Sequence, residues 1–125
     1  MKTIIAGSRK AGQIATNKWD YDLLVKLIQQ KISDEKLQIT EVISGTANGP
    51  DKAGEIWADE NDITITRFKP NWKLSKGAGF QTNNEMASHA DCLIAIYDGK
   101  SSGTKHMIDT MTKQGKKVIC IMLNS

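Results

Sequence analysis

The chain has 125 residues, of which 39% are hydrophobic and 25% charged, a composition typical of one globular domain. Its length is too small for two domains that each bury a core of their own. No apolar run approaches the roughly 18 residues of a membrane span, and the apolar run near the start is too short for a signal-peptide core. We therefore expect a cytoplasmic protein with no membrane contact.

Charge is distributed unevenly along the chain. Residues 1–62 carry eight basic and ten acidic side chains, whereas residues 63–125 carry nine and four. The basic second half suits an anionic small ligand. A net charge of +3 is low for a dedicated nucleic-acid-binding domain, so a nucleic-acid partner is disfavoured.

The cysteines and histidines show no metal-binding pattern. Cys92 and Cys120 each lie in an apolar run and are predicted to be reduced core residues. His89 and His106 have no second ligand at metal-site spacing, so no metal is predicted.

Apolar runs of strand length alternate with stretches of helical periodicity. The predicted strands are Thr3–Ala6, Glu41–Ser44, Ile63–Phe68, Cys92–Tyr97 and Val118–Leu123. The predicted helices are Asn17–Lys31, Pro50–Asn61, Phe80–Ala90 and Gly103–Gln114. Four strands are almost continuously apolar, as expected when both faces are covered, whereas the third alternates like an edge strand.

This alternation predicts an α/β fold: a single Rossmann-like domain with a five-stranded, mainly parallel sheet and helices on both faces. The strand order 3-2-1-4-5 places the alternating third strand at one edge. The apolar fifth strand then forms the other edge, where it needs cover against aggregation. We therefore expect the chain to be a homo-oligomer.

Eight of the ten glycines fall in loops that follow the carboxyl end of a predicted strand. They are Gly7, Gly12, Gly45, Gly49, Gly77, Gly79, Gly99 and Gly103. Ligands of open α/β sheets bind at this edge, where helix N-termini offer free N–H groups. Tight turns also use glycine for positive φ, but the enrichment in all four loops favours a binding site.

The first two loops carry phosphate-binding character. Arg9 follows Gly7 and Ser8 and is expected to contact a phosphate, although it could be a solvated loop charge. The segment SGTANGPD at 44–51 resembles a phosphate loop but matches neither GxGxxG nor GxxxxGKS/T. A standard dinucleotide or Mg-ATP cofactor is therefore disfavoured, and no cofactor is expected. Asp51 either contacts a ribose or complements the dipole of its helix.

The last two loops add polar side chains at predicted helix starts. Asn83, Asn84 and Glu85 could read a base or sugar or simply cap the helix, and Ser101 begins an anion-binding helix terminus or an ordinary cap. Trp72 could stack on a base. The residues predicted to bind the ligand are Gly7, Ser8, Arg9, Ser44, Gly45, Thr46, Asn48, Gly49, Asp51, Trp72, Gly77, Gly79, Asn83, Asn84, Ser101, Ser102, Gly103 and Thr104.

These motifs, in this order, resemble the YspA-like branch of the SLOG superfamily, a Rossmann-like group that also contains the Lonely Guy phosphoribohydrolases and the DprA core. The matching segments are GSR at 7–9, GTANGPD at 45–51, PNW at 70–72, GFQTNNEM at 79–86 and SGT at 102–104. The resemblance implies a nucleotide or nucleotide-derived small molecule bound over the carboxyl ends of the strands.

Two departures from the family pattern bear on catalysis. Thr82 stands where the family usually has arginine, and Lys105 and His106 follow Gly103-Thr104 where the phosphoribohydrolases have a glutamate. Cleavage of an N-glycosidic bond needs a carboxylate, by analogy with glycosidases. Glu85 and Asp98 are the predicted catalytic candidates, with Asp51 as a third.

The incomplete catalytic set favours a binding protein, a sensor or a protein that sequesters its ligand. A nucleoside-monophosphate N-glycosidase or related transferase is the alternative, so whether the chain is an enzyme stays open. A DprA-like contact with single-stranded DNA is a weaker alternative, because the net charge is low.

Overall fold

The structure is a computed structural model that describes residues 1–70 and 77–123. Trp72, which was predicted to stack on a base, lies outside the described residues. Seven strands and four helices are assigned within these residues. In chain order they are β1 (Lys2–Gly7), β2 (Gln13–Ala15), β3 (Lys18–Trp19), α1 (Tyr21–Asp34), β4 (Glu41–Ser44), α2 (Pro50–Glu60), β5 (Thr64–Arg67), α3 (Ala78–His89), β6 (Cys92–Tyr97), α4 (Ser102–Lys113) and β7 (Lys117–Met122).

Five strands form one parallel sheet with the order β5-β4-β1-β6-β7. Counting only these strands, the order is the predicted 3-2-1-4-5. In the central strand β1, Ile4 lies opposite Ile43 of β4 and Leu93 of β6. The predicted single Rossmann-like α/β architecture is therefore confirmed.

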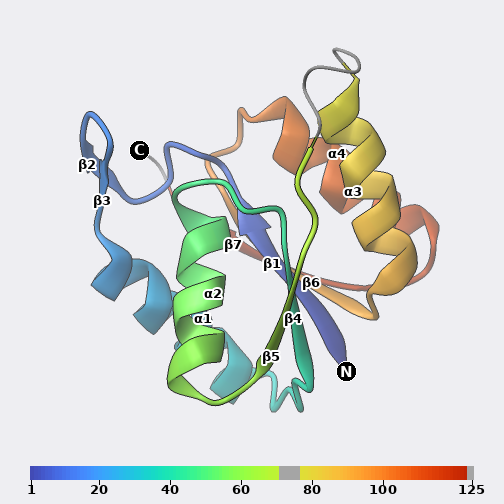
Figure 1. The fold of residues 1–125 in the computed structure, drawn as a ribbon, viewed down its shortest axis with the longest axis horizontal. Helices are drawn as coiled ribbons and strands as arrows, with labels where there is room; N and C mark the ends of the chain where they lie inside the picture. Colours follow the sequence, from blue (N-terminus) through green and yellow to red (C-terminus); the bar gives the residue numbers. More distant parts are fainter. Residues whose placement is uncertain (71–76, 124–125) are drawn as a thin grey trace.

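Helices cover both faces of the sheet, with α1 and α2 on one face and α3 and α4 on the other (Figure 1). Successive residues of β1 point to opposite layers because side chains alternate along a strand. Ile5 packs with Leu24 of α1 and the α2 side chains, and Ile4 packs with Met107 of α4, each isoleucine being fully buried. At the end of β1, a Cβ on Gly7 would lie only 2.1 Å from the carbonyl oxygen of Ile96, so no larger residue fits there.

The first predicted helix starts later than expected, because residues from Gln13 to Trp19 form an antiparallel hairpin of β2 and β3. Asn17 turns the hairpin with a φ of 58°, a left-handed conformation that asparagine tolerates. The Asp20 carboxylate then accepts a hydrogen bond from the Leu23 N–H at 3.0 Å and caps α1. Trp19 consequently belongs to the hairpin and not to a helix.

The two edge strands are both partly exposed. β5 lies at one edge of the sheet, as predicted, but its burial does not alternate: Thr64 and Arg67 are exposed, and Ile65 and Thr66 are half-buried. In β7, Ile119 and Ile121 are buried, whereas Cys120 and Met122 are exposed. β7 was predicted to be buried along its length, with Cys120 in the core. Both predictions were wrong, because an edge strand has one poorly covered face. Cys92 in β6 is buried, as predicted. Self-association through β7 stays a prediction.

One further property concerns membranes. Within residues 1–70 and 77–123, no helix combines the length and the apolar character needed to cross a bilayer.

Candidate functional site

A cleft of about 720 Å³ lies at the carboxyl ends of β1, β4 and β6, within the range of about 300–1,000 Å³ typical of small-molecule sites. We call it the main cleft. Many of the predicted residues come together around it because parallel strands end at one edge of the sheet. Those that line it are Gly7, Arg9, Gly45, Asp51, Gly79, Asn83, Asp98, Ser101, Ser102, Gly103 and Thr104.

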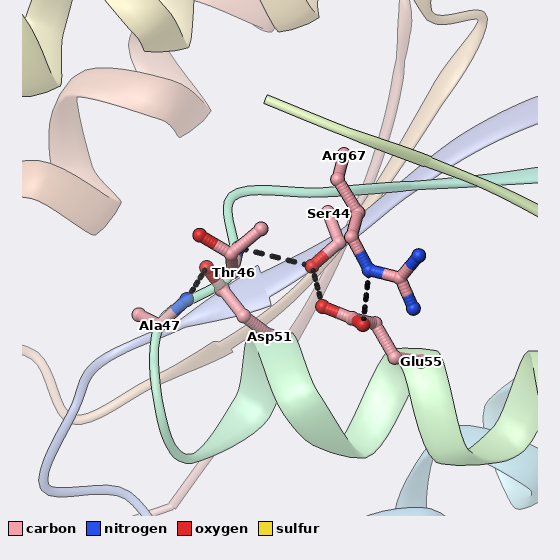
Figure 2. A network of polar contacts seen from close by, with 6 residues as sticks. All are labelled: Ser44, Thr46, Ala47, Asp51, Glu55 and Arg67. Atoms are coloured by element: carbon pink, nitrogen blue, oxygen red, sulfur yellow. Dashed lines mark hydrogen bonds and ion pairs between the residues drawn. The ribbon is translucent and has the colours of Figure 1, made fainter. Parts of the chain in front are cut away.

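One wall of the main cleft is the loop between β4 and α2. A chain of polar contacts joins this loop to α2 and β5 (Figure 2). The Thr46 N–H donates to the Ser44 hydroxyl at 3.1 Å, and that hydroxyl donates to Glu55 at 2.7 Å. Arg67 of the edge strand β5 donates from Nε to the other oxygen of Glu55 at 2.8 Å. Ser44 is fully buried in this relay, so it shapes the loop and does not line the main cleft.

On this wall, Asp51 places a carboxyl at the main cleft. It is 9% exposed, and its Oδ2 accepts a hydrogen bond from the Ala47 N–H at 3.1 Å. Burial raises the pKa of this carboxyl to about 7, against the opposing effect of the Ala47 N–H. A Cβ on Gly45 would lie 2.8 Å from Oδ2, so glycine leaves room for the carboxyl. Near neutral pH, Asp51 can therefore either donate or accept a proton at the main cleft.

The opposite wall, between β6 and α4, carries Asp98 in a different environment. Its Oδ1 accepts hydrogen bonds from the Lys100 N–H at 2.8 Å, the Ser101 N–H at 2.9 Å and the Ser8 hydroxyl at 3.0 Å. The N–H groups of Lys100 and Ser101 lower the pKa of Asp98 most. Asp98 is therefore an ionised acceptor that organises its loop.

Ser8 and the start of α4 share in this organisation. The Ser8 hydroxyl also accepts from the Asp98 N–H at 3.0 Å, and Ser8, 1% exposed, does not line the main cleft. Ser101 caps α4 by accepting from the Thr104 N–H at 3.3 Å and from its hydroxyl at 3.2 Å. The capping role considered for Ser101 is therefore present. The first residues of α4, Ser102–Thr104, also line the main cleft, and the N-terminus of a helix favours an anion nearby.

Helix α3 forms the third side and is attached to α4. The Phe80 ring stacks on His106 with centroids 4.2 Å apart and an interplanar angle of 10°. The Asn83 amide donates to the Gly103 carbonyl at 3.1 Å and approaches His106 Nδ1 at 3.3 Å. Phe80 lines the main cleft and is 46% exposed, so it offers an apolar ring to a bound molecule.

The boundary of α3 changes the expectations for three residues. Asn83, Asn84 and Glu85 were predicted to begin this helix. The prediction was wrong, because the helix begins at Ala78 and the three residues lie in its second turn. Asn83 faces the main cleft, whereas Asn84 and Glu85 are exposed and do not line it. Glu85 is therefore not positioned to act on a molecule bound there.

The remaining predicted residues lie around the main cleft without lining it. Thr46 and Asn48 line a second hollow beside it, Gly49 is buried at the start of α2, and Gly77 precedes α3.

Lys10, Phe80 and Lys100 line the main cleft but were not among the site residues predicted from the sequence. Lys100 joins Arg9 and Lys10 on the lining, where three cationic side chains face two carboxylates. Lys100 could have been predicted, because it lies in DGKSSGT directly before the cap of a predicted helix. Phe80 could not, because only the packing of α3 on α4 brings its ring to the main cleft. No cluster of metal-binding side chains occurs among the described residues.

Comparisons with models of known protein families and with curated protein sequences find no match to this chain. The similarity to the SLOG superfamily consequently rests on the motifs and stays a hypothesis.

Proposed function

We propose that the chain binds a nucleotide-derived small molecule in the main cleft, as a sensor or a sequestering protein. The observation that carries the proposal is the grouping of Arg9, Lys10 and Lys100 around one cleft at the carboxyl ends of the strands. Guanidinium and ammonium groups bind phosphate oxygens strongly. The half-exposed Phe80 ring supplies a surface on which a base can stack.

The carboxylates support binding over catalysis by the predicted candidates. Glu85 does not line the main cleft, and Asp98 already accepts three hydrogen bonds on one oxygen. A general acid needs a pKa near the working pH, and the pKa of Asp98 is shifted the other way.

The proposal is tested by identifying what the protein holds. Mass spectrometry of denatured protein should reveal a co-purified nucleotide derivative. A thermal-shift screen of nucleotides, cyclic dinucleotides and ADP-ribose derivatives should find a ligand that, at about 100 times its Kd, stabilises the fold by about 2.7 kcal/mol. The proposal fails if both approaches find nothing.

A matched pair of lysine variants locates the site. Lys100→Ala should weaken binding of the ligand so found about tenfold, because it removes a cation from the main cleft. Lys113→Ala, in the last turn of α4 and outside the lining of the main cleft, should leave the affinity unchanged. Equal losses in both variants would argue against this cleft.

One observation favours hydrolysis as a second candidate function. Asp51 is a buried carboxyl at the main cleft with a pKa of about 7, which suits general acid–base chemistry. In N-glycosidic cleavage, the bond between the sugar C1′ and the base nitrogen breaks, and water adds to C1′. Asp51 would protonate the leaving nitrogen or accept the proton of the water.

Chromatography of nucleotide mixtures after incubation tests this activity. Wild-type protein should release free base, Asp51→Asn should not, and Glu85→Gln should retain the activity, because Glu85 lies outside the main cleft. If wild-type protein binds nucleotides but releases no base, the hydrolase fails and the binding function stands.

A further inference from the structure

A second hollow of about 420 Å³ adjoins the main cleft and is lined by polar groups. Its lining comes from Arg9, Asn17, Trp19, Thr46, Ala47 and Asn48. One side is the β2–β3 hairpin, which pairs with no strand of the five-stranded sheet. The hairpin is thus an addition to the fold, and what it builds is this hollow.

Contacts on three segments hold the hairpin in place. Trp19 donates from Nε1 to the Arg9 carbonyl at 2.6 Å. The same nitrogen would lie only 3.0 Å from a Cβ on Gly49, so the indole sits directly against the loop before α2. The Gly49 N–H donates to the Tyr21 hydroxyl at 3.1 Å, just beyond the hairpin. The second hollow is therefore preformed, which lowers the entropic cost of filling it.

Arg9 and Ala47 line both the main cleft and the second hollow. The Arg9 side chain is exposed, and within residues 1–70 and 77–123 it forms no ion pair. A phosphate bound to Arg9 would therefore lie at the boundary between the main cleft and the second hollow. If that phosphate carried a substituent on each side, one substituent would lie in the main cleft and the other in the second hollow.

The chemistry of the second hollow differs from that of the main cleft. Apart from Arg9, no charged side chain among the described residues lines it, and it offers the amides of Asn17 and Asn48 and the Thr46 hydroxyl. Amides and hydroxyls pair with sugar hydroxyls and base edges. The volume of about 420 Å³ also lies in the range of small-molecule sites.

We propose that the ligand has two sugar-bearing halves joined by a phosphate or diphosphate, with one nucleoside in the main cleft, the bridge at Arg9 and the second half in the second hollow. This inference rests on the proposed function and narrows its ligand class from nucleotides to dinucleotide-like molecules.

Calorimetric titrations of the full chain with matched probes test it. The probes are the symmetrical dinucleoside diphosphates of adenosine and guanosine, each compared with ADP or GDP. With the base that fits the main cleft, the dinucleoside diphosphate should bind wild-type protein at least tenfold more tightly than the nucleoside diphosphate. The readout for every variant is this ratio of affinities.

Variants in the two spaces should change the ratio differently. Asn48→Trp fills the second hollow and should bring the ratio to about one; Asn17→Gly keeps the positive φ, removes the amide and should lower the ratio severalfold. Phe80→Ala should weaken both probes and preserve the ratio, because Phe80 lines only the main cleft. Circular dichroism checks that each variant is folded.

The outcomes separate the two proposals. If wild-type protein binds the paired probes equally, or if the filled variant keeps the full ratio, the two-part ligand is refuted while nucleotide binding stands. If none of these probes binds, the two-part ligand is refuted; if mass spectrometry and the thermal-shift screen also find nothing, nucleotide binding is refuted as well.

Discussion

The two walls of the main cleft each present an aspartate, and the two carboxyls behave in opposite ways. Asp51 is buried and accepts one N–H from its loop, and its pKa rises to about 7. Asp98 receives two N–H groups and a hydroxyl on one oxygen, and its pKa falls. Burial has the largest effect on Asp51 and favours its neutral acid, whereas the N–H groups of Lys100 and Ser101 have the largest effect on Asp98 and favour its anion. The balance between desolvation and hydrogen-bond donors therefore differs between the two walls.

The contrast assigns different work to the two walls. The wall with Asp98 is a fixed support, because its carboxylate ties the Ser8 hydroxyl and the loop before α4 together. The wall with Asp51 has a group whose charge can change when a ligand arrives. A ligand that brings a phosphate near Asp51 would favour its protonated form, since like charges repel.

The largest expected effect is a pH dependence of stability that disappears in Asp51→Asn. The pKa of Asp51 lies above the ordinary value of 3.8 in the folded state. Its stabilising contribution is therefore complete below about pH 4 and is lost as the pH rises to about 7. Asp51→Asn should match the wild type near pH 4 and exceed its free energy of unfolding by about 4 kcal/mol at pH 8.

Urea denaturation between pH 4 and 8 measures this difference, and Asp98→Asn is the matched comparison. Because the pKa of Asp98 is lowered, its contribution is present above about pH 4 and is lost at lower pH. Asp98→Asn should therefore be less stable than wild type at neutral pH, with the gap narrowing in acid. If the two variants showed the same pH trend, the contrast between the walls would be wrong.

The second effect in size is the loss of the fixed support. Asp98→Ala removes the oxygen that accepts hydrogen bonds from the Ser8 hydroxyl and from the N–H groups of Lys100 and Ser101. We expect a loss of about 2 kcal/mol in the free energy of unfolding at pH 7, measured by urea denaturation. Asp109→Ala, an exposed i,i+4 partner of Lys105, should show almost no change. An unchanged free energy of unfolding in Asp98→Ala would contradict the proposed role of Asp98 in organising its loop.

The sheet could be predicted because its determinants are local. Nearly continuous apolar runs such as Cys92–Tyr97 are typical of buried parallel strands, and their alternation with helices leaves few topologies. The β2–β3 hairpin was missed because its strands have three and two residues and show no periodicity. Its position depends on the contact between Trp19 and Arg9, ten residues apart.

The location of the candidate site could be predicted, because a parallel sheet brings the loops at the carboxyl ends of its strands to one edge. Which side chains face inward was not predictable where a helix boundary or a long-range contact decides it. Glu85 and Asn83 are two residues apart on α3, yet only Asn83 turns to the main cleft. Phe80 and His106 are in contact because α3 packs on α4, and no sequence pattern near either residue predicts that contact.

The smallest expected effect concerns this pairing, which attaches α3 to the wall with Asp98. His106→Ala removes the ring stacked on Phe80 and the neighbour of the Asn83 amide. Because Phe80 is 46% exposed, the loss should be only about 1 kcal/mol, measured by urea denaturation. If α3 is coupled only to the wall with Asp98, the effects of His106→Ala and Asp51→Asn should add, since changes at separate sites add. Adding Asp51→Asn to the His106→Ala protein should then raise the free energy of unfolding at pH 8 by the same amount as adding it to the wild type. A reduced difference in the double variant would show that α3 also governs the burial of Asp51, and that the two walls are one coupled unit.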